Sequence, residues 1–194
     1  MDELVLDIET QKEFADVGGR GNFHLLGVSL VGVFSYEKDA FLSFRENEIK
    51  ELEKLIASCQ RVVGFNIKGF DWPVLQPYLA IDLKKIPTLD IMEEIKNTVG
   101  HRVSLNSVAG ATVGEQKSGD GLEAIRFFRE GNIEALRKYC LDDVRLTRDI
   151  YEFGKNNKKV FFESRIGGEK VAVPVDWEPK QESAPVQAPQ LNLF

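Results

Sequence analysis

The sequence contains few of the residues that build disulfide frameworks or zinc sites, with two cysteines and two histidines among 194 residues. Cys59 and Cys140 have no Cys-x-x-Cys spacing and no partnering histidine, so neither a disulfide framework nor a zinc site is predicted. His24 and His101 stand alone without a ligand pattern. We expect the cysteines to be reduced, partly buried packing residues and the histidines to be structural or surface residues.

Long apolar runs are also missing. No stretch approaches the roughly 20 apolar residues that a membrane-spanning helix needs. The N-terminal sequence MDELVLDIET has neither the basic start nor the apolar region of a secretion signal. We therefore expect a cytoplasmic protein without a membrane partner, and its 43% hydrophobic content is enough for one sizeable core.

Positive charge is not in excess, since 25 Lys and Arg stand against 31 Asp and Glu, a formal net charge of -6. This balance argues against the coating of duplex DNA, which depends on Lys and Arg contacts to phosphates. Two divalent cations held by carboxylates would add +4 at a single site and change the total from -6 to -2. An acidic composition therefore suits metal-dependent phosphate chemistry.

The first part of the chain has the alternation that is typical of strands. Leu4–Ile8, Leu25–Phe34 and Ala40–Phe44 are predicted strands that form an antiparallel meander of three. Glu46–Cys59 carries an apolar helical stripe, and Arg61–Phe65 follows as a short buried strand. This change from hairpins to alternating helix and strand predicts a mixed α/β sheet flanked by helices.

The following part is mainly helical in pattern. Phe70–Leu79, Asp90–Thr98 and Ser104–Ala109 are predicted short helices. Asn132–Phe153 is the longest predicted helix, because its apolar residues recur at three- and four-residue steps. Lys158–Pro174 is predicted to form a terminal hairpin around two glycines.

The composition divides the chain into one domain and a tail. Residues 1–175 are predicted to form the domain. Residues 176–189 are rich in Pro, Gln, Ala and Glu, which cannot build a core, so a disordered linker is predicted there. Residues 190–194, Gln-Leu-Asn-Leu-Phe, then end the chain with three large apolar residues.

The first candidate motif is an acidic pair on the first predicted strand. Asp7 and Glu9 are two residues apart, so both carboxylates project from one face and can share a divalent ion. The alternative for such a pair by itself is an exposed strand end.

The second candidate motif, FNIKGFD, lies where a predicted strand gives way to a predicted helix. Asn66 ends the strand, and Asp71 opens the helix ahead of Pro73. The alternatives are a turn residue for Asn66 and a helix N-cap for Asp71. Capping and metal binding are compatible, since an acidic group at a helix N-terminus is fixed in orientation.

The third candidate motif lies inside the long predicted helix. Tyr139 and Asp143 are four residues apart and therefore neighbours on one helical face, from which a phenol and a carboxylate can reach one reaction centre. The alternative is that Tyr139 packs at the edge of the core while Asp142 and Asp143 are solvated.

Together these motifs resemble the DEDDy family of 3′-to-5′ exonucleases, in which Asp-x-Glu, Asn-x-x-x-Phe-Asp and Tyr-x-x-x-Asp follow one another. The resemblance covers residues 4 to about 153, and residues 104–122 also look like bacterial and archaeal relatives of the exonuclease domain of family-B DNA polymerases. It implies a ribonuclease H-like fold and hydrolysis of phosphodiester bonds at the 3′ ends of single-stranded DNA.

The resemblance also implies a role for each motif residue. Two Mg²⁺ or Mn²⁺ ions are the implied cofactors, one held by Asp7, Glu9 and Asp143, the other between Asp7 and Asp71. Tyr139 is implied to position the attacking water. The Tyr-x-x-x-Asp spacing selects the second of the two adjacent aspartates. Two alternatives stay open: an exoribonuclease with the same chemistry, and a catalytically idle adaptor.

Four further residues are candidates for binding the substrate. Asn66 is expected to orient the 3′-terminal nucleotide or a metal ligand. Phe70 and Trp72 can stack or wedge against terminal bases, as aromatic residues do in single-strand binders, but both also suit the core. Lys117 is a candidate contact to phosphate.

The last five residues resemble the bacterial sliding-clamp-binding motif, Gln-Leu-x-Leu-Phe. In that motif the apolar residues fill a pocket of the clamp and the glutamine fixes the orientation, roles that would fall to Gln190, Leu191, Leu193 and Phe194. The resemblance implies recruitment to the clamp in replication or repair. The alternative is that this segment docks onto its own domain.

Overall fold

The computed structural model describes residues 2–116, 119, 121–164 and 167–178. Within them, a five-stranded sheet has the strand order β3-β2-β1-β4-β5. Its strands are β1 (Glu3–Thr10), β2 (Val28–Ser35), β3 (Ala40–Phe44), β4 (Arg61–Gly64) and β5 (Thr88–Asp90). β2 pairs antiparallel with β1 and β3, whereas β1, β4 and β5 run parallel. The predicted meander of three and the predicted mixed sheet are confirmed.

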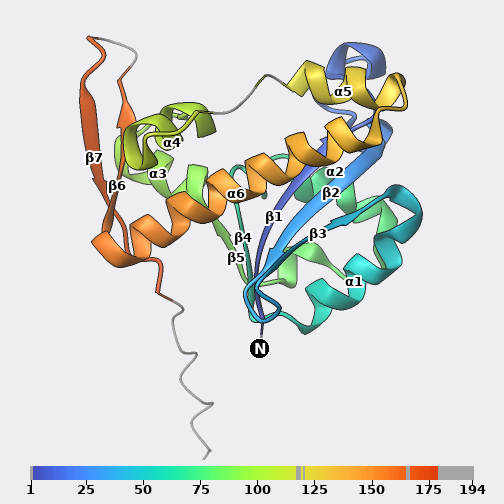
Figure 1. Ribbon diagram of the computed structural model, residues 1–194, viewed down its shortest axis with the longest axis horizontal. Helices are drawn as coiled ribbons and strands as arrows, with labels where there is room; N and C mark the ends of the chain where they lie inside the picture. The colour runs from blue at the N-terminus through green and yellow to red at the C-terminus, as the bar shows by residue number, and fades with distance from the viewer. Residues whose placement is uncertain (1, 117–118, 120, 165–166, 179–194) are drawn as a thin grey trace, which may run out of the picture.

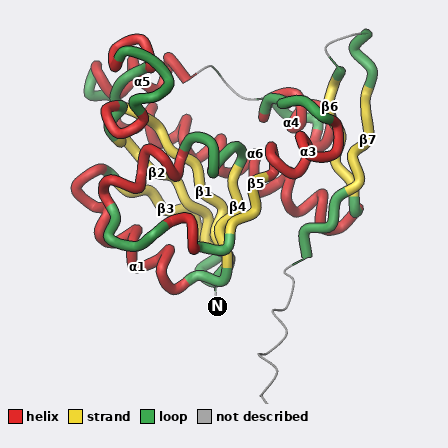
Figure 2. Tube along the Cα trace, turned by 180° about the vertical axis from the view of Figure 1, so that it is seen from behind, coloured by secondary structure: helices red, strands yellow, loops and turns green. Residues whose placement is uncertain are grey.

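Helices cover both faces of the sheet. They are α1 (Ile49–Ser58), α2 (Asp71–Leu75), α3 (Ile91–Val99), α4 (Leu105–Val113), α5 (Gly121–Arg129) and α6 (Ile133–Asn157). Short 3-10 helices are η1 (Phe14–Val17), η2 (Phe23–Leu25), η3 (Glu46–Glu48), η4 (Gln76–Tyr78) and η5 (Leu83–Lys85). The long helix α6 crosses one face, and α1 lies on the other (Figures 1 and 2).

A hairpin of β6 (Lys159–Glu163) and β7 (Lys170–Pro174) follows α6 and stands beside α4 (Figure 1). This is the terminal hairpin that the sequence predicted. No helix in the described ranges combines the length and the apolar character needed to cross a membrane.

Several predicted boundaries are wrong by a few residues. The strand expected from residue 25 begins at Val28, because the preceding residues form η2 and Gly27 has a left-handed φ of 70°. The long helix continues to Asn157 and ends where Lys158 adopts a φ of 55°. β5 and α5 were not predicted: three residues are too few for an alternation, and the glycines at the start of α5 weaken its helical pattern.

The packed domain also extends beyond residue 175. Trp177 is 1% exposed, and its ring stacks on Tyr151 at a centroid distance of 6.1 Å. The Arg61 guanidinium donates to the Trp177 carbonyl at 2.7 Å and to Glu3 at 2.8 Å. These contacts attach the end of the described chain to the first strand of the sheet.

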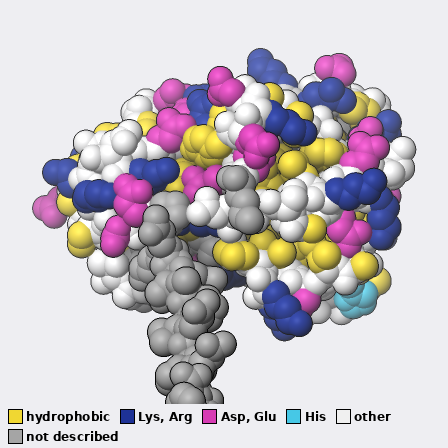
Figure 3. All heavy atoms as spheres, turned by 90° about the horizontal axis from the view of Figure 1, so that it is seen from below, with side chains coloured by type: hydrophobic (Ala, Val, Ile, Leu, Met, Phe, Trp, Pro, Cys, Tyr) yellow, Lys and Arg dark blue, Asp and Glu magenta, His cyan; other side chains and the backbone are white. Residues whose placement is uncertain are grey.

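Lys and Arg side chains are interspersed with Asp and Glu on the face at which the chain begins (Figure 3). Neither sign of charge gathers there into a single patch. The described side chains visible on this face therefore form no single basic surface of the kind by which proteins coat duplex nucleic acid.

The alternation of β1 sorts its side chains between two cores. Leu4, Leu6 and Ile8 pack in the apolar cluster that includes α1, whereas Val5 packs in the cluster that includes α6. Since alternate side chains of a strand share a face, the acidic pair of β1 lies on the same side as Val5, toward α6.

Gly32 determines how closely α6 can approach the sheet. It lies on β2, paired with Asp7 of β1. A Cβ atom at Gly32 would lie 2.9 Å from Cys140 Sγ and 2.9 Å from Val144 Cγ2, closer than side chains tolerate. The absence of a side chain at this position therefore allows α6 to place its inner face directly over β1.

Gly32→Ala should destabilise the protein by about 1–3 kcal/mol, because the added methyl group overpacks the contact between β2 and α6. Gly21→Ala is the matched control, since a Cβ there meets no atom within 4 Å. Denaturant unfolding of both variants measures the difference. Equal stability of the two would show that α6 does not depend on this contact.

Candidate active site

A pocket of about 330 Å³ opens beside the second half of β1 and the segment that follows β4. Among the residues that line it are the four carboxylates of the three sequence motifs, Asp7, Glu9, Asp71 and Asp143. Asn66 and Phe70 line it as well. The carboxyl ends of the parallel strands β1 and β4 lie at the same edge of the sheet, which is why distant parts of the chain meet there.

The acidic pair of β1 has a neighbour that sequence reasoning missed. Ligand-type atoms of Asp7, Glu9 and Cys140 all lie within 4.8 Å of one another. The Cys140 thiol donates to the Asp7 backbone carbonyl at 3.7 Å. Burial raises the pKa of this thiol well above its usual value, and the carboxylates of Asp7, Glu9 and Asp143 raise it further. No spacing in the sequence relates Cys140 to Asp7.

Asp71 is the first residue of α2, and its side chain faces β1. It is 3% exposed, and the Ile8 backbone amide donates a hydrogen bond to its carboxylate. Burial, followed by repulsion from Asp7, raises the pKa of Asp71 well above its ordinary value. The N-cap of α2 is Phe70, so the simple capping interpretation of Asp71 is wrong.

Asn66 is held in place by a residue that the sequence did not indicate. Its backbone has a left-handed φ of 67°, and its carbonyl accepts hydrogen bonds from the amides of Gly69 and Phe70. Its side-chain Oδ1 accepts from the Arg102 guanidinium at 2.7 Å, while its backbone N–H donates to Asp90 Oδ1 at 2.8 Å. Asn66 therefore forms the expected turn with its backbone, and Arg102 fixes its side chain at the pocket.

The structure separates the two adjacent aspartates of α6. Asp143 is 2% exposed and lines the pocket, and Tyr139, one turn earlier, is 4% exposed and packs edge-on against Phe127. Asp142 points elsewhere and lies 3.6 Å from Arg145. The interpretation of Asp143 as a solvated residue is therefore wrong.

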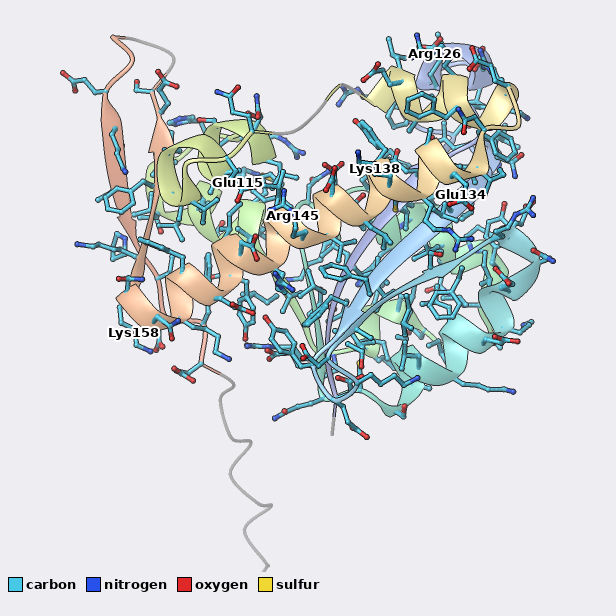
Figure 4. The ribbon with its side chains drawn as sticks, viewed as in Figure 1. Glu115, Arg126, Glu134, Lys138, Arg145 and Lys158 are labelled. Carbon is cyan, nitrogen blue, oxygen red and sulfur yellow. The ribbon has the colours of Figure 1, made fainter. Side chains whose placement is uncertain are left out.

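Arg145 attaches the segment after α4 to the outer face of α6. Its guanidinium lies 2.6 Å from Glu115 and 3.3 Å from Asp149, and Figure 4 shows Glu115 and Arg145 side by side. Two residues further along, Lys117 lies outside the described residues, as do the linker beyond residue 178 and the terminal segment 190–194.

The two aromatic candidates of the second motif lie in different places. Phe70 lines the pocket and packs edge-on against Phe14 and Phe23 at centroid distances of 6.0 and 6.2 Å. Trp72 is only 5% exposed, and its indole nitrogen donates to Thr88 Oγ1 at 3.3 Å. The first turn of α2 directs this ring into the core, as the alternative interpretation of Trp72 expects, and Trp72 is not among the residues that line this pocket.

The donor set suits hard divalent cations. All four carboxylates supply oxygen atoms, the ligands that Mg²⁺ and Mn²⁺ prefer in proteins. Neighbouring carboxylates disfavour the charged form of Asp71, and this repulsion is typical of carboxylates that are grouped around a cation. Asp7, Glu9, Asp71 and Asp143 are the residues that would hold the ions.

The comparisons with known proteins agree with this architecture. Residues 4–153 match the RNase_H_2 family model of the RNase_H superfamily, so the chain belongs to this superfamily. The mixed five-stranded sheet flanked by helices is the ribonuclease H-like fold expected from the sequence. Superfamily membership also supports the coarser part of the expected function, an activity of the nuclease type.

Among solved structures, the chain is similar to the family B DNA polymerase from the hyperthermophilic archaeon Pyrobaculum calidifontis, with a TM-score of 0.59 and 20% sequence identity. The match covers 79% of this chain and 24% of the polymerase chain, so this protein spans about a quarter of that enzyme. The comparison with curated proteins found no significant match.

Asp71→Asn should raise the melting temperature of the metal-free protein by about 2–4 °C, corresponding to roughly 1 kcal/mol, because it removes a buried charge that Asp7 repels. Mn²⁺ should then stabilise the variant less than the wild type, since a cation ligand is lost. Thermal unfolding with and without Mn²⁺ measures both effects.

The pH dependence of this difference has a definite sign. The folded pKa of Asp71 is raised, so its unfavourable contribution is complete above that pKa and disappears below the unfolded value. The advantage of Asp71→Asn should therefore shrink as the pH falls. Asp142→Asn, which changes a partly exposed neighbour, should alter stability by less than about 0.5 kcal/mol. A lower melting temperature for metal-free Asp71→Asn would contradict the repulsion argument.

Proposed function

We propose that this protein is a metal-dependent 3′-to-5′ exonuclease of the DEDDy type that removes nucleotides from the ends of single-stranded DNA. The observation that carries the proposal is the pocket itself. Three motifs from β1, the β4–α2 junction and α6 contribute four carboxylates, an amide and two aromatic rings to one space of about 330 Å³. A space near the lower end of the range for small-molecule pockets fits one terminal nucleotide rather than a continuous duplex.

Most of the residues that line the pocket are of two kinds, carboxylates and apolar side chains, and each kind suits a different part of the proposed reaction. Two divalent ions, when bound, supply charge neutralisation at the phosphate and activation of water. Asp7 lies close to Glu9 on its own strand, and its charge acts on Asp71 at the start of α2, so it would be the residue that contacts both ions. Tyr139, one helical turn before Asp143, would orient the attacking water.

The apolar residues that line the pocket suit the sugar and base of a terminal nucleotide. Phe14, Phe65 and Phe70 contribute aromatic rings, and further apolar side chains come from Leu26, Leu122 and Ile125. Asn66, held by Arg102, would orient the 3′-terminal nucleotide. An apolar surface is tolerant of base identity, since each base has a stacking face.

The fold of this chain is similar to that of part of a DNA polymerase, and this similarity favours DNA over RNA as the substrate. Degradation of end-labelled single-stranded DNA and RNA, each with Mg²⁺, Mn²⁺ or a chelator, tests this choice directly. Preferential removal of nucleotides from DNA 3′ ends supports the proposal. A preference for RNA would favour the exoribonuclease alternative, and inactivity under all metal conditions would favour the idle adaptor.

Asp7→Ala should abolish hydrolysis without loss of folding, because the shared ligand is removed from a site crowded with like charges.

Tyr139→Phe should keep Mn²⁺ binding but slow hydrolysis by about 10²- to 10⁴-fold, since only the group that orients water is lost. Asp142→Ala, at the adjacent position, should stay close to the wild-type rate. Single-turnover rates on labelled DNA distinguish the three, and a wild-type rate for Tyr139→Phe would assign this residue to packing alone.

We further propose the bacterial sliding clamp as a partner of the terminal segment, on the basis of its Gln-Leu-x-Leu-Phe pattern. A labelled peptide of this segment should bind a clamp with a roughly micromolar Kd. Changing Leu193 and Phe194 to Ala should weaken the binding free energy by several kcal/mol, where about 1.4 kcal/mol corresponds to a tenfold change in Kd. Activity on free oligonucleotides should not change when residues 190–194 are deleted. Equal clamp binding by both peptides would reject this partner, and a lower melting temperature after deletion would favour docking onto the domain.

A further inference from the structure

A second pocket, here called the α5 pocket, adjoins the pocket of the candidate active site. It has a volume of about 380 Å³, and its lining residues are Glu13, Leu122, Ile125, Arg126, Arg129 and Glu130. Three of these residues, Glu13, Leu122 and Ile125, also line the active-site pocket. The two pockets are therefore direct neighbours, and a flexible chain whose end lies beside the carboxylates can pass over the shared side chains from one pocket into the other.

The charged side chains of the two pockets suit different parts of such a chain. Carboxylates dominate the active-site pocket, and Lys12 is the one basic side chain among the described residues that line it. The α5 pocket adds two guanidinium groups, those of Arg126 and Arg129. Lys and Arg are the usual partners of backbone phosphates. A nucleic acid strand that passes through the α5 pocket therefore meets cationic side chains before its end reaches the carboxylates.

The two arginines of the α5 pocket have different neighbours. Arg129 lies 2.6 Å from Asp16 of η1 and so attaches the end of α5 to the segment after β1. Arg126 lies 3.4 Å from Glu123 and 4.0 Å from Glu130, and its side chain is 58% exposed at the outer surface of α5 (Figure 4). Exposed ion pairs of this kind contribute little free energy, so a phosphate can displace these carboxylates from the guanidinium. Arg129 thus shapes the pocket, while Arg126 can bind a ligand.

Leu122 and Lys12 lie where the strand would enter the active-site pocket. Leu122 lines both pockets and is 56% exposed, the highest value among the large hydrophobic side chains of the described residues. An exposed apolar side chain of this size suits the face of a base. The Lys12 amide donates to the Leu26 carbonyl at 3.1 Å, and its carbonyl accepts from Thr10 Oγ1 at 2.8 Å. These bonds fix the backbone of Lys12, while its side chain is exposed at the pocket.

We propose that the α5 pocket binds the nucleotides that precede the 3′ end of a single strand. Lys12 contacts the phosphate of the terminal nucleotide, Arg126 contacts a phosphate further along the strand, and Leu122 contacts a base between them. The inference rests on the proposed function in placing the 3′ end beside the carboxylates. It adds a selection for length, because a free nucleotide reaches Lys12 alone, whereas a strand reaches Arg126 as well.

The test measures binding of a 5′-labelled oligothymidylate of about eight nucleotides to the full-length protein by fluorescence anisotropy. Ca²⁺, which also prefers oxygen ligands, replaces Mg²⁺, and a gel checks that the strand stays intact. Unlabelled thymidine 5′-monophosphate competes for the terminal site in a parallel titration. Thermal unfolding of each variant confirms that it is folded.

Arg126→Ala should weaken strand binding by about 5- to 30-fold and leave competition by the monophosphate unchanged. It should also reduce the slope of log affinity against log salt concentration by roughly 0.7, the value for one lost phosphate contact on a single strand. Lys12→Ala should weaken both ligands. Arg137→Ala is the matched control, since Arg137 is exposed on α6 and is not among the residues that line either pocket.

Glu130→Gln should have the opposite effect and strengthen strand binding by about twofold, because it removes a carboxylate that lies 4.0 Å from Arg126 in the α5 pocket. A wild type that binds no strand, equal strand affinity for Arg126→Ala and Arg137→Ala, or an equal loss of strand and monophosphate in Arg126→Ala would overturn the proposal. Hydrolysis with Mg²⁺ is measured separately. A protein that binds strands through Arg126 without degrading them would refute the proposed function and leave this binding site standing.

Discussion

The close contact between α6 and the sheet is the interaction on which the candidate site depends. Gly32 presents no side chain to the helix, so Cys140 and Val144 pack directly over β2. The close packing of α6 on the sheet also places Asp143 in the lining of the pocket that contains Asp7, a residue far from it in the sequence. A helix held further from the sheet would move Asp143 away from the carboxylates of β1.

This contact buries several carboxylates close together, and the rest of the fold must compensate for the unfavourable free energy of their burial and repulsion. Glu9, Asp71 and Asp143 are between 2% and 7% exposed, and the pKa of Asp71 is raised by burial and by Asp7. Buried carboxylates that repel one another oppose folding. Apolar clusters on both faces of the sheet provide the compensating free energy. Bound cations would relieve the repulsion, so we expect cation binding to stabilise the fold as well as to support the proposed hydrolysis.

Contacts from outside the three motifs complete the pocket. Arg102, in the segment before α4, donates a hydrogen bond to the side-chain Oδ1 of Asn66. Asp90 accepts a hydrogen bond from the backbone N–H of Asn66. Arg145 pairs with Glu115, two residues after α4. Leu122 and Ile125 of α5 are among the apolar residues that line the pocket. The functional residues therefore depend on positions that carry no recognisable motif themselves.

The sequence by itself determined the local properties of this protein: the alternation that puts Asp7 and Glu9 on one face of a strand, the four-residue step from Tyr139 to Asp143, and the order of strands and helices that defines a mixed sheet. Tertiary structure alone decided that Cys140 joins the acidic pair, that Arg102 holds Asn66 and that Trp72 faces the core instead of the pocket. The physical reason is that periodicity specifies the side of an element on which a residue lies, while its neighbours depend on which other element packs there and how closely.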